Sequence, residues 1–167
     1  YERSRIFFFL NKADIKKKIY ENEYIENFSI FKKYPSTLMI KVEQTNFLAH
    51  LKKNDEIFLI GSNGRLIKTK EKIKDLPFIF GNFDKKEFFR FKEIIDKSDL
   101  AFKKIKNLYF FPSRRWDIET NFGIIIKLPS DKLKESLDLS LEIMEDKNFN
   151  NIKIIDLRQN NQVIING

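Results

Sequence analysis

The chain has 167 residues, of which 42% are hydrophobic and 34% charged, a balance typical of folded globular proteins. It contains no cysteine, which excludes disulfides and thiolate metal sites, and no apolar run approaches the about 18 residues of a membrane span. The net charge of +8 fits an acidic partner, a membrane surface or nucleic acid. Because lysines are scattered through every segment, compositional bias explains this charge better than a nucleic-acid role.

The first 45 residues predict a helix followed by two strands. Asn11 is placed to cap the helix, and Ile15 and Ile19 then share one helical face. Alternation in residues 28–30 and 38–42 indicates two strands, separated by a turn at Pro35-Ser36. A unit of this size buries little core by itself.

Residues 46–167 predict a larger domain rich in hairpins. Asn63-Gly64 is a strong hairpin signal because both turn positions favour positive φ. Asp84 is a helix cap, and an aromatic stripe that includes Phe88, Phe91 and Phe102 predicts a buried helical face. Strands are expected at 47–51, 56–60, 108–111, 115–120 and 124–128, a second helix at 130–147, and a final hairpin made of 152–159 and 162–165.

The pattern as a whole indicates an α+β protein with a mostly antiparallel sheet and helices packed on one face. We expect two domains, residues 1–45 and 46–167.

Candidate catalytic groups are few. The sole histidine, His50, lies on an expected strand, where a solvent-facing or hydrogen-bonded structural role is the simplest interpretation. Gly61-Ser-Asn-Gly64 lacks the spacing of a phosphate-binding loop. Asp117 and Asp156 could be read as an acid–base pair, but their strand alternation predicts that they face water. We therefore expect no catalytic, cofactor-binding or metal-binding residues, and no enzyme.

A binding surface is the stronger candidate. Arg114 and Arg115 precede the only tryptophan, Trp116, and arginine and tryptophan often anchor interfaces. Packing of the tryptophan on the core, with arginine stems covering its rim, is an equally good interpretation of these residues. The terminal segment Gln162–Ile165 is apolar and uncharged, so at a sheet edge it would invite strand addition by a partner, with Arg158 as a charged anchor.

These features together resemble the FtsQ/DivIB family of bacterial division proteins. Residues 14–25, 28–35 and 37–43, with Ala49, resemble the junction between its POTRA domain and its β-domain, and residues 57–60 with 64–67 resemble a hairpin of that family. The most specific marks are Arg115-Trp-Asp-Ile118, Gly123, Lys127-Leu-Pro129 and Ile155-Asp-Leu-Arg158. The chain departs from the family pattern at Tyr24-Ile25, Gly61 and Asn46, and its POTRA part is a partial α-β-β unit.

The resemblance implies a non-enzymatic divisome scaffold in the inner membrane, with a single span and a globular part in the periplasm. Its implied partners are FtsB and FtsL, without nucleic acid or cofactors, and its implied role is control of septal cell-wall synthesis. Because the chain starts at Tyr1 rather than Met, we expect the span upstream of it. The implied partner-binding residues are Arg114, Arg115, Arg158, Gln159, Gln162, Val163, Ile164 and Ile165.

Two alternatives remain open from the sequence. One is a basic nucleic-acid-binding module, suggested by basic residues interleaved with aromatics in Phe89–Lys92. The other is a POTRA-type module of an outer-membrane assembly or secretion system.

Overall fold

A computed structural model describes residues 12–35, 37–149, 151–159 and 162–167. The chain divides into two compact units, one made of Tyr1–Leu48 with Leu59–Lys68, the other of Ala49–Phe58 with Thr69–Gly167. Within the described ranges, no helix is long and apolar enough to cross a membrane.

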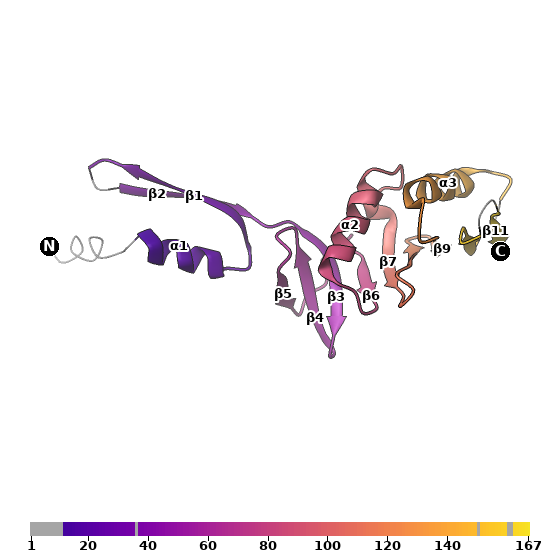
Figure 1. Ribbon diagram of the computed structural model, residues 1–167, viewed down its shortest axis with the longest axis horizontal. Helices are drawn as coiled ribbons and strands as arrows, with labels where there is room; N and C mark the ends of the chain where they lie inside the picture. Colours follow the sequence, from indigo (N-terminus) through magenta and orange to yellow (C-terminus); the bar gives the residue numbers. More distant parts are fainter. Residues whose placement is uncertain (1–11, 36, 150, 160–161) are drawn as a thin grey trace. The chain divides into compact units, whose positions relative to one another are not determined.

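The first unit contains the helix and two strands expected from the sequence (Figure 1). Helix α1 (Lys12–Glu21) precedes strands β1 (Ile25–Lys33) and β2 (Thr37–Gln44), which form an antiparallel hairpin. The ring of Tyr20, in α1, packs edge-on against Phe28 of β1 at a centroid distance of 5.0 Å. The expected cap, Asn11, lies outside the described residues, and the assignment of residues 1–45 to a POTRA domain stays a prediction.

A polar network within the first unit ties the turn after strand β4 (Glu56–Gly61) to the ends of β1 and β2. The Glu26 carboxylate accepts hydrogen bonds from the hydroxyls of Ser62, at 2.7 Å, and Thr45, at 3.0 Å. The Asn63 side chain donates to the carbonyls of Glu23 and Ile25. Each bond is worth about 0.5–1.5 kcal/mol, so together they hold this turn firmly in the first unit.

The expected hairpin at Asn63-Gly64 forms, but with different turn geometry. Gly64 has φ of 73°, and its N–H donates to the Gly61 carbonyl. Asn63 is not in the positive-φ region that a type I′ turn requires, because the bond between Gly64 and Gly61 makes Ser62 and Asn63 the central turn residues and leaves only Gly64 with positive φ.

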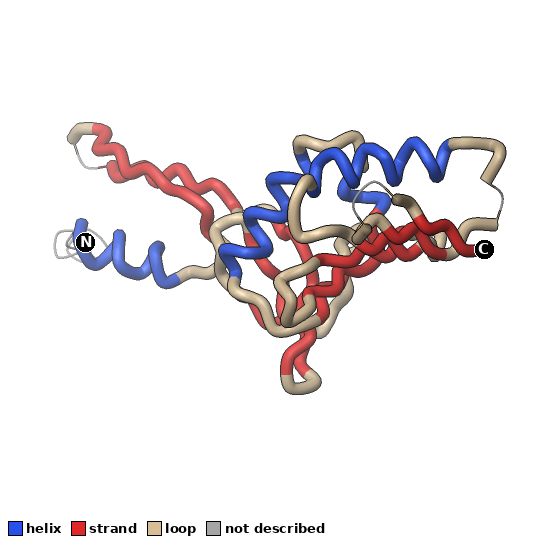
Figure 2. Tube along the Cα trace, turned by 45° about the vertical axis from the view of Figure 1, so that its right-hand side comes forward, coloured by secondary structure: helices blue, strands red, loops and turns tan. Residues whose placement is uncertain are grey.

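The described strands outside the first hairpin form a nine-stranded sheet in the order β11-β10-β9-β8-β7-β6-β3-β4-β5. Helices α2 (Lys85–Asp96) and α3 (Leu133–Glu145) lie on one face of it (Figures 1 and 2). The bounds of the remaining strands are Phe47–Lys53 (β3), Leu66–Thr69 (β5), Phe78–Phe80 (β6), Ile105–Phe110 (β7), Trp116–Thr120 (β8), Ile125–Lys127 (β9), Ile154–Asp156 (β10) and Ile164–Asn166 (β11).

The mixed α+β class and the mostly antiparallel sheet are confirmed. The sheet nevertheless contains parallel pairs that the sequence did not indicate: β3 with β6, β6 with β7, and β9 with β10. Helix α2 connects β6 to β7 and α3 connects β9 to β10, since parallel neighbours need a crossover.

The core of the second unit lies between this sheet and its two helices. Asp84 caps α2 as expected, and its carboxylate accepts the N–H of Lys86 at 3.0 Å. Phe88, Phe91 and Ile95 bury the predicted helical stripe. Phe102 was wrongly included in this stripe, because α2 ends at Asp96 and Phe102 begins a short 3-10 helix, η2 (Phe102–Lys104).

Helix α3 also begins later than expected. Its N-cap is Lys132, in the left-handed region with φ of 50° and without a side-chain capping bond. Leu137, Ser140 and Ile143 are its buried positions, and the Ser140 hydroxyl donates to the Leu137 carbonyl.

Candidate functional site

The terminal strand β11 lies at the end of the nine-stranded sheet, as the sequence reasoning required. It pairs antiparallel with β10, Ile155 opposite Ile165 and Asp156 opposite Ile164. Among the described strands it has no second neighbour. The strand begins at Ile164 rather than Gln162, so Gln162 and Val163 precede it. The turn expected at Asn160-Asn161 lies outside the described residues.

The hydrogen bonds of β10 show which backbone groups of β11 point outward. The Lys153 carbonyl accepts from the Ile125 N–H and the Leu157 N–H donates to the Lys127 carbonyl, so Ile155, between them in β10, faces β9. The Lys153 N–H donates to the Asn166 carbonyl, so Asn166 of β11 faces β10. The even-numbered residues of β10, Ile154 and Asp156, therefore face β11 and pair with Asn166 and Ile164. The N–H and C=O of Ile165 consequently point toward the open edge.

A groove of about 360 Å³ lies beside the segment that leads into β11. Its lining includes Gln159, Gln162 and Val163, together with Leu139 of α3. Val163 and Leu139 are each about two-fifths exposed. Three of the sequence-predicted residues thus share a concave surface that ends at the residue before β11.

Arg158 is held by the carboxylate of Asp156, the last residue of β10. Its Nε and Nη2 donate to the two oxygens of Asp156, at 2.8 and 2.5 Å. This arginine lowers the pKa of the Asp156 carboxyl below its ordinary value. The Arg158 side chain remains 41% exposed, so it still presents donors to solvent.

Arg115 forms a similar pair with Asp117, two residues further along the chain. Its Nε donates to Asp117 at 3.1 Å, and its guanidinium lies 4.6 Å from the ring centre of Phe111. Burial raises the pKa of the Asp117 carboxyl, an effect that Arg115 and then Arg158 partly offset. Because both arginines act on Asp117, they belong to one charged cluster.

The expectation that Asp117 and Asp156 face water was wrong. They are only 5% and 7% exposed, and Lys127 of β9 is paired in register with both of them. The three residues therefore form a row across β8, β9 and β10 on the face opposite the helices. Buried carboxylates require such basic partners, which accounts for the arginines on either side.

Arg114 does not belong to this cluster. It has φ of 60°, and its guanidinium forms an ion pair with Glu87 of α2. It therefore points to the helix side of the sheet, whereas Arg115 lies on the opposite face.

Trp116 packs inward, in agreement with one of the two interpretations of the sequence. It is 3% exposed, and its ring stacks on Phe91 of α2 at 4.8 Å with an interplanar angle of 4°. Phe83 and Phe110 enclose the same ring. Trp116 anchors β8 to the helix layer and is unavailable for a partner.

His50 is a fully buried structural residue. Its Nε2 accepts the backbone N–H of Ile73 at 2.9 Å, so the proton lies on Nδ1, 3.3 Å from the Leu76 carbonyl. The ring stacks on Phe78 at 4.6 Å, and burial lowers the pKa of the imidazole. Both ring nitrogens are occupied, which leaves no free base.

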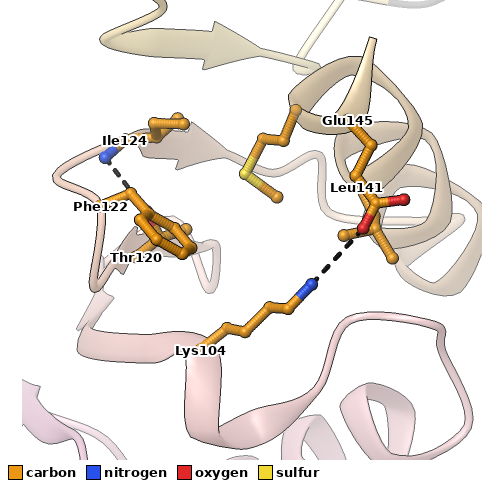
Figure 3. A pocket seen from close by; sticks show the side chains of 7 residues that line it. Lys104, Thr120, Phe122, Ile124, Leu141 and Glu145 are labelled. Carbon is orange, nitrogen blue, oxygen red and sulfur yellow. Dashed lines mark hydrogen bonds and ion pairs between the residues drawn. The ribbon is translucent and has the colours of Figure 1, made fainter.

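A second cavity, of about 310 Å³, lies at the Thr120 end of β8 (Figure 3). Phe122, Ile124 and Leu141 supply its apolar lining, and Lys104 faces Glu145 across it with 3.5 Å between Nζ and Oε1. It is separate from the arginine cluster, which lies near the Trp116 end of the same strand.

Sequence reasoning missed Asp117, Lys127 and Asp156 as parts of the candidate surface. A signal was present in Arg115-Trp-Asp117 and Asp156-Leu-Arg158, where opposite charges two residues apart share one face of a strand.

Comparisons with known proteins identify the family of this chain. Residues 49–158 match the family described as Cell division protein FtsQ/DivIB, C-terminal. The chain is 28% identical over 161 residues to Cell division protein FtsQ of Rickettsia bellii, covering 95% of this chain and 60% of that protein. It is 31% identical over 133 residues to Cell division protein DivIB of Clostridium botulinum, covering 79% of this chain and 47% of that protein.

A solved structure of the major extracytoplasmic domain of DivIB from Geobacillus stearothermophilus aligns with a TM-score of 0.45 and 18% identity, over 57% of this chain and 87% of that one. The chain spans about half to three fifths of the length of the two curated relatives named above. The family match covers well over half of the chain and contains the buried tryptophan, both arginine–aspartate pairs and helices α2 and α3. This chain belongs to the FtsQ/DivIB family of cell division proteins.

Proposed function

We propose that this chain is the extracytoplasmic part of a membrane-anchored divisome scaffold that binds an FtsB-like partner by strand addition at β11. Through FtsB and FtsL it would help to control septal cell-wall synthesis, without catalysis of its own. Residues 1–45 would supply a partial POTRA domain, and the membrane span would lie upstream.

The observation that carries the proposal is the open edge of β11. The strand is uncharged and begins the sheet order in the described part of the chain, and Ile164 is 43% exposed. Native proteins protect such edges with charges, bulges or a covering segment, because unpaired backbone groups otherwise template pairing with other chains. An added strand would bond to Ile165, while its side chains meet the groove lined by Gln159, Gln162 and Val163.

The arginine cluster supports binding at the same edge, from the face of the sheet opposite the helices. Each backbone bond contributes about 0.5–1.5 kcal/mol net, so a three-residue strand alone binds weakly. Arg158 uses Nε and Nη2 for Asp156 and keeps Nη1 for a carboxylate of the partner. Such a charged contact adds specificity and association rate.

Replacing Ile165 by proline tests strand addition. The proline removes an N–H that points outward and so leaves the bonds to β10 in place. We expect Ile165→Pro to weaken binding of the extracytoplasmic segment of FtsB from the same organism at least about tenfold, because it removes one bond and obstructs its neighbours. Binding is measured by calorimetry.

Ile165→Ala is the matched control, since it shortens the same side chain and keeps the N–H. Equal affinities for the proline and alanine variants would contradict strand addition at this edge.

The arginines supply a second comparison. Arg158→Gln should weaken binding, whereas Arg114→Gln should leave it unchanged, because Arg114 is paired with α2 on the other side of the sheet. Equal losses would show that the charge of the chain, and not the cluster, determines affinity.

A further inference from the structure

The β1–β2 hairpin carries an exposed apolar and basic surface that the proposed partner site does not use. From Phe31 to Lys41 the sequence contains three lysines and no acidic residue. The same segment holds the most exposed aromatic side chain among the described large hydrophobic residues, Tyr34, at 87%. Exposed tyrosine beside lysine is the pattern found where proteins meet a membrane interface.

The strand register places the relevant side chains on one face of the hairpin. Phe31 is directly opposite Met39, Lys33 is opposite Thr37, and Lys41 is opposite Ser29. Directly opposed residues share a face, so Phe31 and Met39 form an apolar pair with a lysine on either side along the strands. Phe31 and Met39 are 53% and 52% exposed.

Helix α1 lies against the other face and cannot cover this pair. Its Tyr20 contacts Phe28, which is three residues before Phe31 and therefore points to the opposite side of β1. No described residue forms an ion pair with Lys33 or Lys41. Both ammonium groups are available to an anionic ligand.

We propose that Phe31, Lys33, Tyr34, Met39 and Lys41 form a membrane-docking surface for anionic phospholipids. The lysines bind headgroup phosphates, and Phe31, Met39 and Tyr34 enter the interfacial region. Protruding side chains at the end of a hairpin need no complementary cavity in a bilayer interface. Because residues 31–41 carry three lysines and no acidic residue, the surface prefers anionic to zwitterionic lipid. This contact is independent of β11, so it stands or falls separately from the partner site.

The first experiment measures partitioning of the 167-residue chain onto vesicles of equal parts phosphatidylglycerol and phosphatidylcholine, and onto phosphatidylcholine alone, by co-sedimentation. Each lysine near an anionic surface is worth about 1 kcal/mol, so Lys33→Gln with Lys41→Gln should lower the partition coefficient on anionic vesicles about 30-fold.

The matched control is Lys103→Gln with Lys153→Gln, which removes two exposed lysines from the second unit and leaves the hairpin intact. We expect less than about a threefold change for this pair. Equal losses for the two double variants would overturn the proposal, because the binding would then arise from the net charge of +8.

The second experiment tests insertion. Phe31→Trp places an indole on the proposed surface, and bromine on the lipid acyl chains should quench its fluorescence while Trp116, which is 3% exposed, remains unquenched. Phe31→Ser with Met39→Ser should abolish partitioning at high salt, where the lysines are screened.

Binding without quenching would overturn the insertion. Failure to bind anionic vesicles combined with binding of soluble polyglutamate would assign the surface to an acidic protein and overturn the lipid proposal.

Discussion

Replacement of Glu119 by glutamine should remove a pH-dependent part of the stability of the second unit. The Glu119 carboxylate, on β8, accepts hydrogen bonds from Lys106 Nζ and Asn107 Nδ2, both at 2.8 Å, and from the Tyr109 hydroxyl at 2.7 Å. These donors, Lys106 foremost, lower the pKa of Glu119 from 4.5 to about 2. The Glu119 side chain is only 15% exposed, so solvent screens these bonds weakly.

The direction of the pH effect follows from the lowered pKa. The stabilisation is fully present above the unfolded pKa of 4.5 and is lost as the pH falls toward about 2, because the unfolded chain takes up the proton first. A shift of this size corresponds to about 3 kcal/mol, of which about 2 kcal/mol is lost between pH 7 and about pH 3.

Urea unfolding at these two pH values measures the effect, with the fluorescence of the buried Trp116 reporting on the second unit. The difference in unfolding free energy between the two pH values should be about 2 kcal/mol smaller for Glu119→Gln than for the unmodified chain. Taking this difference removes the contributions of the other carboxylates, including Asp156. An equal pH dependence in both proteins would refute the reasoning.

Three further perturbations test the packing. Gly81→Ala should destabilise the second unit by about 2 kcal/mol or more. Gly81 has φ of 108°, and an added Cβ would lie 2.1 Å from the Phe110 carbonyl oxygen. An unchanged midpoint of urea unfolding would contradict this prediction. Trp116→Ala should cost about 3–5 kcal/mol through the cavity it leaves, and a thermal midpoint close to that of the unmodified chain would argue against a packed ring. Burial lowers the pKa of His50, so the free energy of unfolding should decline as the pH falls below 6.5, the pKa of the imidazole in the unfolded chain. His50→Gln should flatten this decline in urea unfolding. An unchanged slope would show that the proton is taken up by a group other than the His50 ring, which accepts the Ile73 N–H.

Local patterns predicted the elements well where the deciding interactions are themselves local. The Asp84 cap depends on atoms two residues away, and the alternation of residues 28–42 specifies a hairpin whose strands are adjacent in sequence. The inward orientation of Trp116 remained undecided, because its contact with Phe91 joins residues far apart in the chain.

The candidate partner-binding surface at β11 also combines features that local patterns predict with features that depend on contacts between distant residues. An apolar, uncharged terminal segment indicated an edge strand, and β11 does lie at the edge of the sheet. Asp117 and Asp156 were misread as water-facing, because alternation separates two faces of a strand without saying whether either one is covered.

By itself the sequence determined the family, through motifs such as Arg115-Trp-Asp and Asp-Leu-Arg158, and the succession of helices and strands. Only the tertiary structure decided the order of the strands, the parallel neighbours of β6 and β9, and the separation of Arg114 from Arg115 and Arg158. The physical reason is that periodicity records which side of an element is apolar, whereas pairing order and charge clusters depend on contacts between segments that the chain brings together only on folding.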